Sequence, residues 1–162
     1  MADGAGHPGP VATHDDLVNH LAMWSPWLPF AEAAVHAPRQ PGVYLARQGT
    51  AGRLVYVGMA GERRGQGIRG RLTVYRRGKA AVSGLGEAVF DRALADVDFV
   101  RQRLDELREG TTKRAAAWAR DAFTWADLHI RWAVTKDRSS AAALERKVLA
   151  ALHAMPLWNR AH

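Results

Sequence analysis

Three short segments of the chain have the residue pattern of β-strands. Residues 43–47 and 53–58 are rich in β-branched and aromatic side chains, and the intervening residues 49–52 (GTAG) predict a hairpin turn. In residues 128–134, large apolar side chains occupy every second position, a period of two that is typical of a strand. The pattern therefore predicts three strands, two of which form a hairpin.

Apolar residues at helical spacing predict helices in the remaining segments. Thr13 is the expected N-cap of a short helix, with Asp15 and Asp16 in its first turn. Residues 24–30 contain two prolines that prevent this helix from continuing, so we expect their aromatic side chains to pack on the main domain. Further helices are predicted for about residues 68–77, 86–109, 111–126 and 139–154.

The order of these elements predicts a small α/β domain with a three-stranded, mainly antiparallel sheet flanked by helices. Residues 41–162 would form this domain, with a helical insert at about residues 79–127. We expect this insert to buttress the core because it is net acidic, and DNA reading and dimerisation are the alternatives. Residues 1–40 would form an N-terminal tail and a helical and aromatic extension. Within it, residues 1–12 have little to bury and are expected to be mobile.

The register of the hairpin decides whether its two tyrosines are neighbours, because side chains alternate between the two faces of a strand. An even loop puts each tyrosine on a face with aliphatic side chains of the other strand. An odd loop puts Tyr44 opposite Tyr56. It leaves an aliphatic face for the core, formed by Val43, Leu45, Val55 and Val57. We prefer the odd loop because it separates polar from apolar side chains more cleanly.

The distribution of charge adds a candidate partner. The 162 residues carry a net charge of +7, and the excess lies mainly in residues 41–79, which hold nine Lys or Arg and one acid, Glu62. A basic block of this kind favours a polyanion partner, and a solvated helix face is the alternative. The side chains expected to contact nucleic acid are Arg63, Arg64, Arg69, Arg76, Arg77 and Lys79.

The chain contains no cysteine, which excludes disulfides, zinc ribbons, iron–sulfur clusters and thiol nucleophiles. No segment approaches the roughly 18 apolar residues of a membrane span, and the N-terminus lacks the pattern of a signal peptide. We therefore expect a cytoplasmic protein.

Two charged residues fall on or beside predicted helix faces that otherwise point to the core. Arg71 shares a stripe with Ile68, Leu72 and Tyr75, and an arginine at such a position is costly unless it meets an anion. Glu145 lies at the edge of the apolar face of the last helix, as an ion-pair partner or a metal ligand. An arginine and a carboxylate beside one cleft suggest metal-assisted chemistry on phosphate.

Five short motifs follow one another along residues 41–162. They are Pro41-Gly-Val-Tyr44, Val55-Tyr-Val-Gly58, Arg71-Leu-x-x-Tyr75, Leu144-Glu145 and Pro156-Leu-Trp-Asn159. In this order they resemble the motifs of the GIY-YIG nuclease superfamily, which includes homing endonucleases, excision-repair nucleases and some restriction enzymes. The resemblance implies a three-stranded antiparallel sheet flanked by helices. It also implies a metal-dependent endonuclease that hydrolyses phosphodiester bonds, with DNA as the expected substrate.

The resemblance also implies roles for single residues. Glu145 would hold one divalent ion, Mg²⁺ or Mn²⁺. Tyr44 or Tyr56 would take a proton from the attacking water, and the choice between them stays open. Arg71 would stabilise charge on the phosphoryl oxygens. Tyr75 would position phosphate or water, and Asn159 would orient groups at the site.

The chain departs from the family pattern at one position of the second motif. Many members carry a lysine after this motif, where this chain has Met59, and Lys79, Arg63 or Arg64 would be the substitutes. Residues 65–70 (GQGIRG) also match a dinucleotide-binding fingerprint, but the parallel strand that such a site requires is not predicted after them.

Three alternatives to DNA cleavage remain at this point. The same fold would serve a non-catalytic nucleic-acid-binding module, an RNA-cleaving nuclease or a toxin-like nuclease. A single-domain nuclease that cuts both strands often needs to dimerise, so a homodimer is a further expectation.

Overall fold

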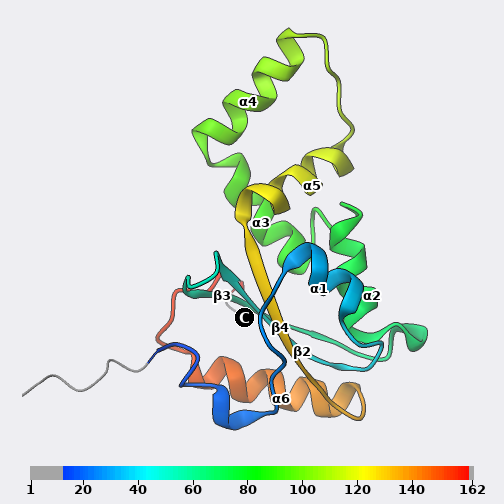
Figure 1. Cartoon of the computed structure of the whole chain (residues 1–162), viewed down its shortest axis with the longest axis vertical. Helices are drawn as coiled ribbons and strands as arrows, with labels where there is room; N and C mark the ends of the chain where they lie inside the picture. Colours follow the sequence, from blue (N-terminus) through cyan, green and yellow to red (C-terminus); the bar gives the residue numbers. More distant parts are fainter. Residues whose placement is uncertain (1–12, 161–162) are drawn as a thin grey trace, which may run out of the picture.

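The computed structural model describes residues 13–160 and has an antiparallel sheet at its centre (Figure 1). The strands are β1 (Leu28–Pro29), β2 (Gly42–Gln48), β3 (Leu54–Ala60) and β4 (Leu128–Val134), in the spatial order β1-β4-β2-β3. The α/β class is confirmed, but the expected number of three strands is wrong. The additional strand, β1, has only two residues and pairs with β4 at the edge of the sheet, where a proline is tolerated. The expectation for residues 1–12 lies outside the described residues.

Helices accompany this sheet along the described part of the chain. The α-helices are α1 (Phe30–His36), α2 (Gly67–Arg76), α3 (Gly84–Leu94), α4 (Val97–Arg108), α5 (Ala115–Ala126) and α6 (Arg138–Ala151). Two short 3-10 helices, η1 (Asn19–Leu21) and η2 (Arg63–Gly65), complete them. Within residues 13–160, no helix has the length and apolar character needed to cross a membrane.

Two predicted helices differ from the structure because of local side-chain hydrogen bonds. Thr13 does not cap an α-helix, since its backbone and hydroxyl both donate to the Asp16 carboxylate, and the following residues form turns and η1. The helix expected over residues 86–109 is interrupted at Asp96. The Asp96 carboxylate accepts a hydrogen bond from the backbone N–H of Phe99 at 2.8 Å and caps α4 as a separate helix.

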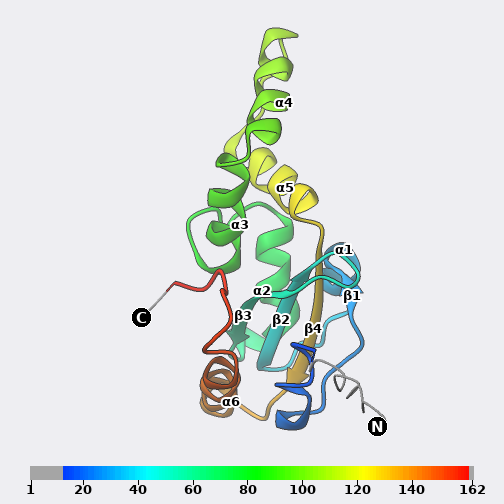
Figure 2. The same ribbon diagram turned by 90° about the vertical axis from the view of Figure 1, so that its left-hand side faces the viewer.

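The two faces of the sheet are covered by different parts of the chain (Figure 2). On one face, α6 and the N-terminal segment enclose a small apolar cluster that includes Val18, Val43 and Val148. On the other face, α1, α2, α3 and α5 enclose a larger cluster around Tyr44 and Tyr75. Helix α4 lies furthest from the sheet, at the top of Figure 2.

The hairpin has the expected parity but a different pairing. Tyr44 lies opposite Gly58, so Tyr44 and Tyr56 share a face of the sheet without facing each other directly. A β-bulge follows, because Ala46 pairs with Tyr56 but Arg47 pairs with Leu54. Because of the extra residue, side chains of β3 beyond the bulge point to the opposite face of the sheet from the one that simple alternation would give. The aliphatic face is therefore formed by Val43, Leu45, Leu54 and Val57, and the predicted Val55 belongs to the opposite cluster.

The N-terminal segment covers two arginines of the sheet. Arg131 on β4 is only 6% exposed, and its guanidinium lies 4.8 Å from the ring centre of Trp27 and 5.2 Å from that of Trp24. Asp15 is a shared counterion, with its carboxylate oxygens 3.6 Å from Arg131 Nη2 and 3.8 Å from Arg47 Nη1. A single carboxylate thus offsets two largely buried positive charges.

We predict that Asp15→Ala lowers the free energy of unfolding by about 1–3 kcal/mol, because it removes a charged partner from two largely buried arginines. Urea denaturation followed by circular dichroism measures this change. The matched control is Asp16→Ala, since Asp16 is exposed and bonds only to Thr13. Equal unfolding midpoints for the two variants would contradict the prediction.

Candidate active site

All three tyrosines of the chain lie together at one end of the core. The hydroxyl oxygens of Tyr44 (β2) and Tyr75 (α2) are 3.1 Å apart, and the Tyr44 and Tyr56 (β3) rings stack with their centres 6.3 Å apart. The backbone N–H of Leu85, in the first turn of α3, donates to the Tyr75 hydroxyl at 3.2 Å. Tyr44 and Tyr75 are each 1% exposed, whereas Tyr56 is only partly buried. Tyr56 is thus the most accessible of the three phenols.

Two glycines leave the space that this cluster needs. A Cβ at Gly58 would lie 2.3 Å from Cζ of the Tyr44 ring, so any side chain there would displace the tyrosine. Gly84 has a positive φ of 55°, and a Cβ on it would lie 2.6 Å from both Arg71 Nη2 and the Tyr75 hydroxyl. The same point is 3.4 Å from the Tyr56 hydroxyl. The polar groups of these three side chains therefore converge beneath Gly84.

Arg71 reaches this point from the stripe of α2 that the sequence predicts. Ile68, Leu72 and Tyr75 of that stripe are fully buried, and the Arg71 guanidinium lies 4.8 Å from the ring centre of Tyr75. Burial alone would lower the pKa of Arg71, but the neighbouring phenols of Tyr75 and Tyr44 reverse the effect, and its pKa is raised. The guanidinium is therefore a fixed positive charge beside the phenols.

Tyr56 and Glu145 face a common cavity of about 380 Å³. Tyr56 comes from β3 and Glu145 from α6, and Gly84 of α3 forms another part of the wall. The remaining lining residues are Glu87, Ala88, Asp91, Arg92, Trp158, Asn159 and Arg160. Tyr44 and Tyr75 stand behind this wall. The cavity thus brings Glu145 to the accessible tyrosine.

Hydrogen bonds to the backbone of β3 hold the C-terminal segment against this strand. The Asn159 side chain accepts from the backbone N–H of Val57 at 3.0 Å and donates to the carbonyl of Val57 at 2.7 Å. The backbone N–H of Trp158 donates to the carbonyl of Val55. Asn159 therefore lines the cavity, but the two polar atoms of its amide are engaged with the strand.

The electrostatics of the tyrosines depend on this arrangement. Burial raises the pKa of Tyr44 well above the ordinary value of tyrosine, and the phenol of Tyr75 raises it further. Burial also raises the pKa of Tyr56, with Tyr75, Glu145 and Glu87 acting in the same direction and Arg71 opposing them. The two carboxylates are therefore close enough to influence the Tyr56 phenol. In the protein alone, both phenols stay protonated at neutral pH.

The cavity offers oxygen ligands for a divalent ion. Glu145, Glu87 and Asp91 supply carboxylates of the type that Mg²⁺ prefers, although Glu87 is paired with Arg160. Across residues 13–160, no three or more His, Cys, Asp or Glu side chains are grouped closely enough to form a metal cage. These residues fit an ion held by one carboxylate, with water and substrate as its other ligands, as is usual for Mg²⁺.

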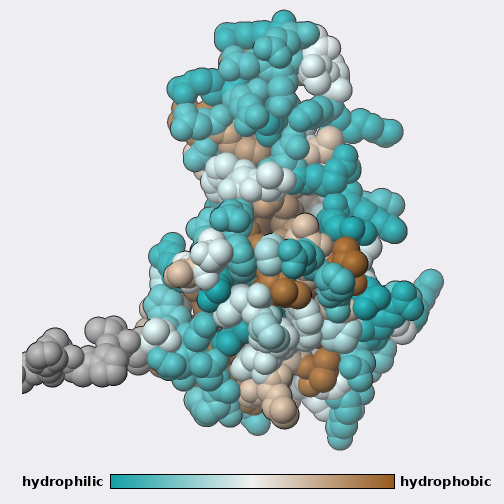
Figure 3. Space-filling model, in the orientation of Figure 1, coloured by the Kyte–Doolittle hydropathy of each residue, from teal (hydrophilic) through white to brown (hydrophobic). Residues whose placement is uncertain are grey.

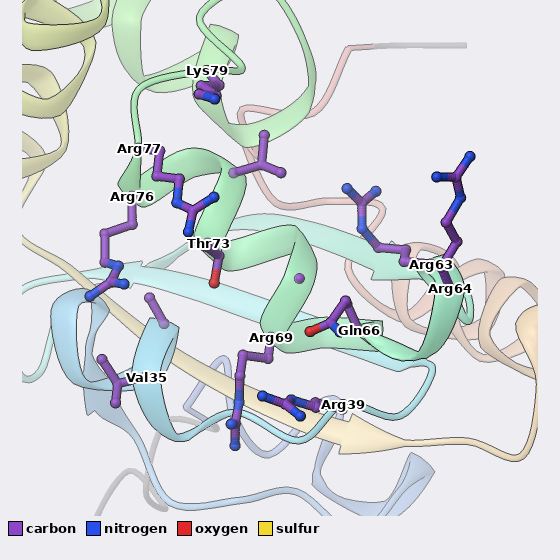
Figure 4. A pocket seen from close by; sticks show the side chains of 13 residues that line it. Val35, Arg39, Arg63, Arg64, Gln66, Arg69, Thr73, Arg76, Arg77 and Lys79 are labelled. Carbon is purple, nitrogen blue, oxygen red and sulfur yellow. The ribbon is translucent and has the colours of Figure 1, made fainter.

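A second depression, with a volume of about 700 Å³, lies beside α2 and contains the predicted nucleic-acid contacts (Figure 4). The lining cations are Arg39, Arg63, Arg64, Arg69, Arg76, Arg77 and Lys79, and no acidic residue lines it. We call this surface the basic groove. It is bordered by α1 through Ala34 and Val35 and by α2 through Thr73 and Val74.

Helix α2 separates the two surfaces. With 100° per residue, Arg71 and Tyr75 point to one side of the helix and Arg69, Thr73 and Arg76 to the other. Arg69 is anchored there, since its Nε donates to the carbonyl of Ala37 at 2.6 Å. The proposed lysine substitutes Lys79, Arg63 and Arg64 lie in the basic groove and do not line the cavity, and Met59 packs with the apolar cluster under α6.

Sequence reasoning missed Arg39, Gly84, Glu87 and Asp91. Arg39 is the only Lys or Arg in residues 1–40, a segment with a net negative charge, so the distribution of charge did not indicate that it belongs to a basic surface. Glu87 and Asp91 are four residues apart on one face of α3, a spacing that would have placed them together. Comparison with known proteins adds no further residue: no protein-family model, curated protein or solved structure matches this chain.

We predict that Tyr44 and Tyr56 of the folded protein do not ionise near pH ~10, the ordinary pKa of tyrosine. The folded state holds Tyr44 and Tyr56 protonated more strongly than the unfolded chain does. Their contribution to stability is therefore present below pH ~10 and is lost as the pH rises towards the folded-state pKa values. Tyrosinate absorbance and circular dichroism should change together, at a pH above that of the urea-unfolded chain. Ionisation of two or more of the three tyrosines near pH ~10 with unchanged circular dichroism would contradict this, because it would include Tyr44 or Tyr56.

Proposed function

We propose that this protein is a metal-dependent endonuclease of the GIY-YIG type that hydrolyses phosphodiester bonds, with DNA as its substrate. The observation that carries the proposal is the convergence of Tyr56, Arg71 and Tyr75 beneath Gly84, because Tyr56 and Gly84 also line the cavity that Glu145 lines. These are the residue types that phosphoryl hydrolysis requires: a proton acceptor, a fixed cation and a carboxylate.

Tyr56 is the proton acceptor in this proposal, and Tyr44 is a positioning residue. Tyr44 is 1% exposed and hydrogen-bonded to Tyr75, so water cannot reach its hydroxyl without moving the core. Tyr56 borders the cavity directly. Because its pKa is raised, Tyr56 would act as the acceptor only after its own proton has passed to solvent, which requires additional positive charge that favours the phenolate and offsets the nearby carboxylates.

Arg71 supplies part of that charge and binds the phosphate. Its guanidinium stands beside the phenols and would stabilise negative charge as it develops on the phosphoryl oxygens. Tyr75 holds this geometry through its bonds to Tyr44 and to the backbone of Leu85. Glu145 would hold one Mg²⁺ or Mn²⁺ ion, which supplies Lewis-acid stabilisation of the leaving oxygen when bound.

The basic groove supports a polyanionic substrate. Its seven cations would contact several consecutive phosphates, because no carboxylate in the groove competes for them. The groove lies on the opposite side of α2 from Arg71. It would therefore bind a part of the nucleic acid that does not contain the bond to be cleaved.

A binding module without catalysis is the second candidate, and the separation of groove and cavity favours it. Binding in the groove requires none of the tyrosines or Glu145. An RNA-cleaving or toxin-like nuclease would use the same site on another substrate. Duplex DNA, single-stranded DNA and RNA are therefore compared in the same assays.

We predict that Glu145→Gln lowers metal-dependent cleavage by at least ~10²-fold, because it removes the carboxylate that would hold the ion. Tyr56→Phe should lower it by a similar ~10²-fold through loss of the proton acceptor. Cleavage of plasmid DNA with Mg²⁺ or Mn²⁺, and with chelator added, measures both effects. Glu109→Gln, at the exposed C-terminal end of α4, is the matched control and should retain full activity.

Three results would reject parts of this assignment. Full activity of Glu145→Gln or Tyr56→Phe would remove that residue from the site. Activity that survives chelation would exclude the metal. Salt-sensitive binding without cleavage under either metal would favour the non-catalytic module.

We predict that the triple variant Arg64→Ala, Arg76→Ala, Arg77→Ala binds DNA more weakly and with a reduced salt dependence. The slope of log K against log salt should fall by about 0.9 for each phosphate contact removed. Fluorescence anisotropy over a salt series gives this slope. Arg53→Ala, Arg114→Ala, Arg138→Ala is the charge-matched control, because these exposed arginines lie outside the groove. Equal slopes for the two triple variants would place the contacts elsewhere.

A further inference from the structure

A third depression, with a volume of about 410 Å³, lies where α1 and α5 meet β4. Its apolar walls are formed by Pro29, Phe30, Ala31, Phe123 and Leu128. The ring centres of Phe30 and Phe123 are 4.6 Å apart, and Phe30 is the more accessible of the two because it is only partly buried. Figure 3 shows apolar surface between hydrophilic patches where α1 lies in Figure 1. We call this depression the aromatic pocket.

The aromatic pocket adjoins the basic groove along two helices. Arg76, the last residue of α2, lines both of them. On α1, Phe30 lines the pocket, and Ala34, about one helical turn further on, lines the groove. In Figure 4, Arg76 lies at the opposite end of the groove from Arg64. The pocket therefore continues the groove at the end where Arg76 lies.

A second cation stands where the two surfaces meet. Arg120 of α5 lines the aromatic pocket, and its Nη1 donates to the backbone carbonyl of Arg77 at 3.4 Å. Arg77 follows α2 and lines the basic groove. Both Arg76 and Arg120 are exposed, so their charges are open to a ligand. Positive charge thus continues from the groove to the pocket, and a group in the pocket would have anion-binding side chains beside it.

We propose that the aromatic pocket binds a base of single-stranded nucleic acid whose phosphates lie in the basic groove. Surfaces that bind single strands combine a cationic groove for the backbone with aromatic rings on which bases stack. Bases of a duplex are paired and stacked on one another, so only an unpaired base enters the pocket. Charge favours a base over an apolar side chain of another protein, because the adjoining groove is lined by seven cations and no acid.

Polar groups of the pocket suit the edge of a base. Thr124 and Asp127 line it beside the two rings, and both are exposed. The Asp127 carboxylate would accept a hydrogen bond from the exocyclic amino group of cytosine, which thymine and uracil lack. The inference rests on the nucleic-acid binding proposed for the groove, and it narrows the substrate to one that is single-stranded or locally unpaired.

We predict that the full chain binds a single strand of about 12 nucleotides ~5- to ~100-fold more tightly than an abasic strand with the same phosphates. Phe30→Leu keeps an apolar side chain against Phe123 but removes the ring, so it should reduce this ratio and leave duplex binding unchanged. Fluorescence anisotropy without metal measures the affinities. Phe90→Leu is the matched control, because Phe90 packs on the same core cluster and lines neither pocket nor groove.

The outcomes separate this inference from the proposed function. Equal affinity of the parent chain for the two strands would overturn the base site and leave the groove as a phosphate-binding surface. A ratio that Phe30→Leu does not change would also overturn it, and the pocket would then suit an apolar side chain of another protein. A parent chain that binds neither strand nor duplex would reject nucleic acid as the partner of the groove, and with it the proposed function.

A substitution at Asp127 tests the contact to the base edge in the same assay. The parent chain should prefer a cytosine strand to a thymine strand by about 3- to 10-fold, and Asp127→Asn should reduce this preference. Asn tolerates the left-handed backbone of residue 127, where φ is 47°, so the fold is kept. Asp105→Asn, exposed on α4 and outside both surfaces, is the matched control. An unchanged preference in Asp127→Asn would remove this carboxylate from the site.

Discussion

The burial of the Tyr44 phenol in the central strand is the constraint on which the site depends. A phenol in this position needs a hydrogen-bond partner, and the Tyr75 hydroxyl provides it at 3.1 Å. The ring needs space across the sheet, and the glycine at position 58 provides it. The Tyr75 hydroxyl in turn accepts from the backbone of Leu85, which brings α3 to the site. Tyr56 and Arg71 obtain their positions from these contacts.

The strands and most helices could be predicted from periodicity, because each has one clear apolar face. The third predicted strand coincides with β4, and α6 begins at Arg138, one residue before the predicted start. The errors arose where a local contact outweighed the pattern. Asp96 breaks a continuous apolar repeat into α3 and α4, and the bulge at Val55 shifts the hairpin pairing. Strand β1 has only two residues, too few to show the alternation of apolar and polar side chains by which a strand is predicted.

The candidate site could be predicted in part, since its residues lie on regular elements. The helical stripe correctly grouped Arg71 with Tyr75, and the parity of the hairpin put both strand tyrosines on one face. The sequence could not separate the roles of Tyr44 and Tyr56, because their difference is burial, which depends on where α3 lies. The basic block also contains two groups of arginines that the sequence did not separate. Arg71 lies beneath Gly84 with the tyrosines and Arg69 lines the groove, on opposite sides of one helix.

The insert is therefore part of the site as well as an addition to the fold. Gly84 and Leu85, at the start of α3, close over Arg71 and Tyr75, and Glu87 follows in the cavity wall. The other end of α3 leads through Asp96 into α4. One short helix thus connects the ordering of the phenols with α4, the helix that lies furthest from the sheet.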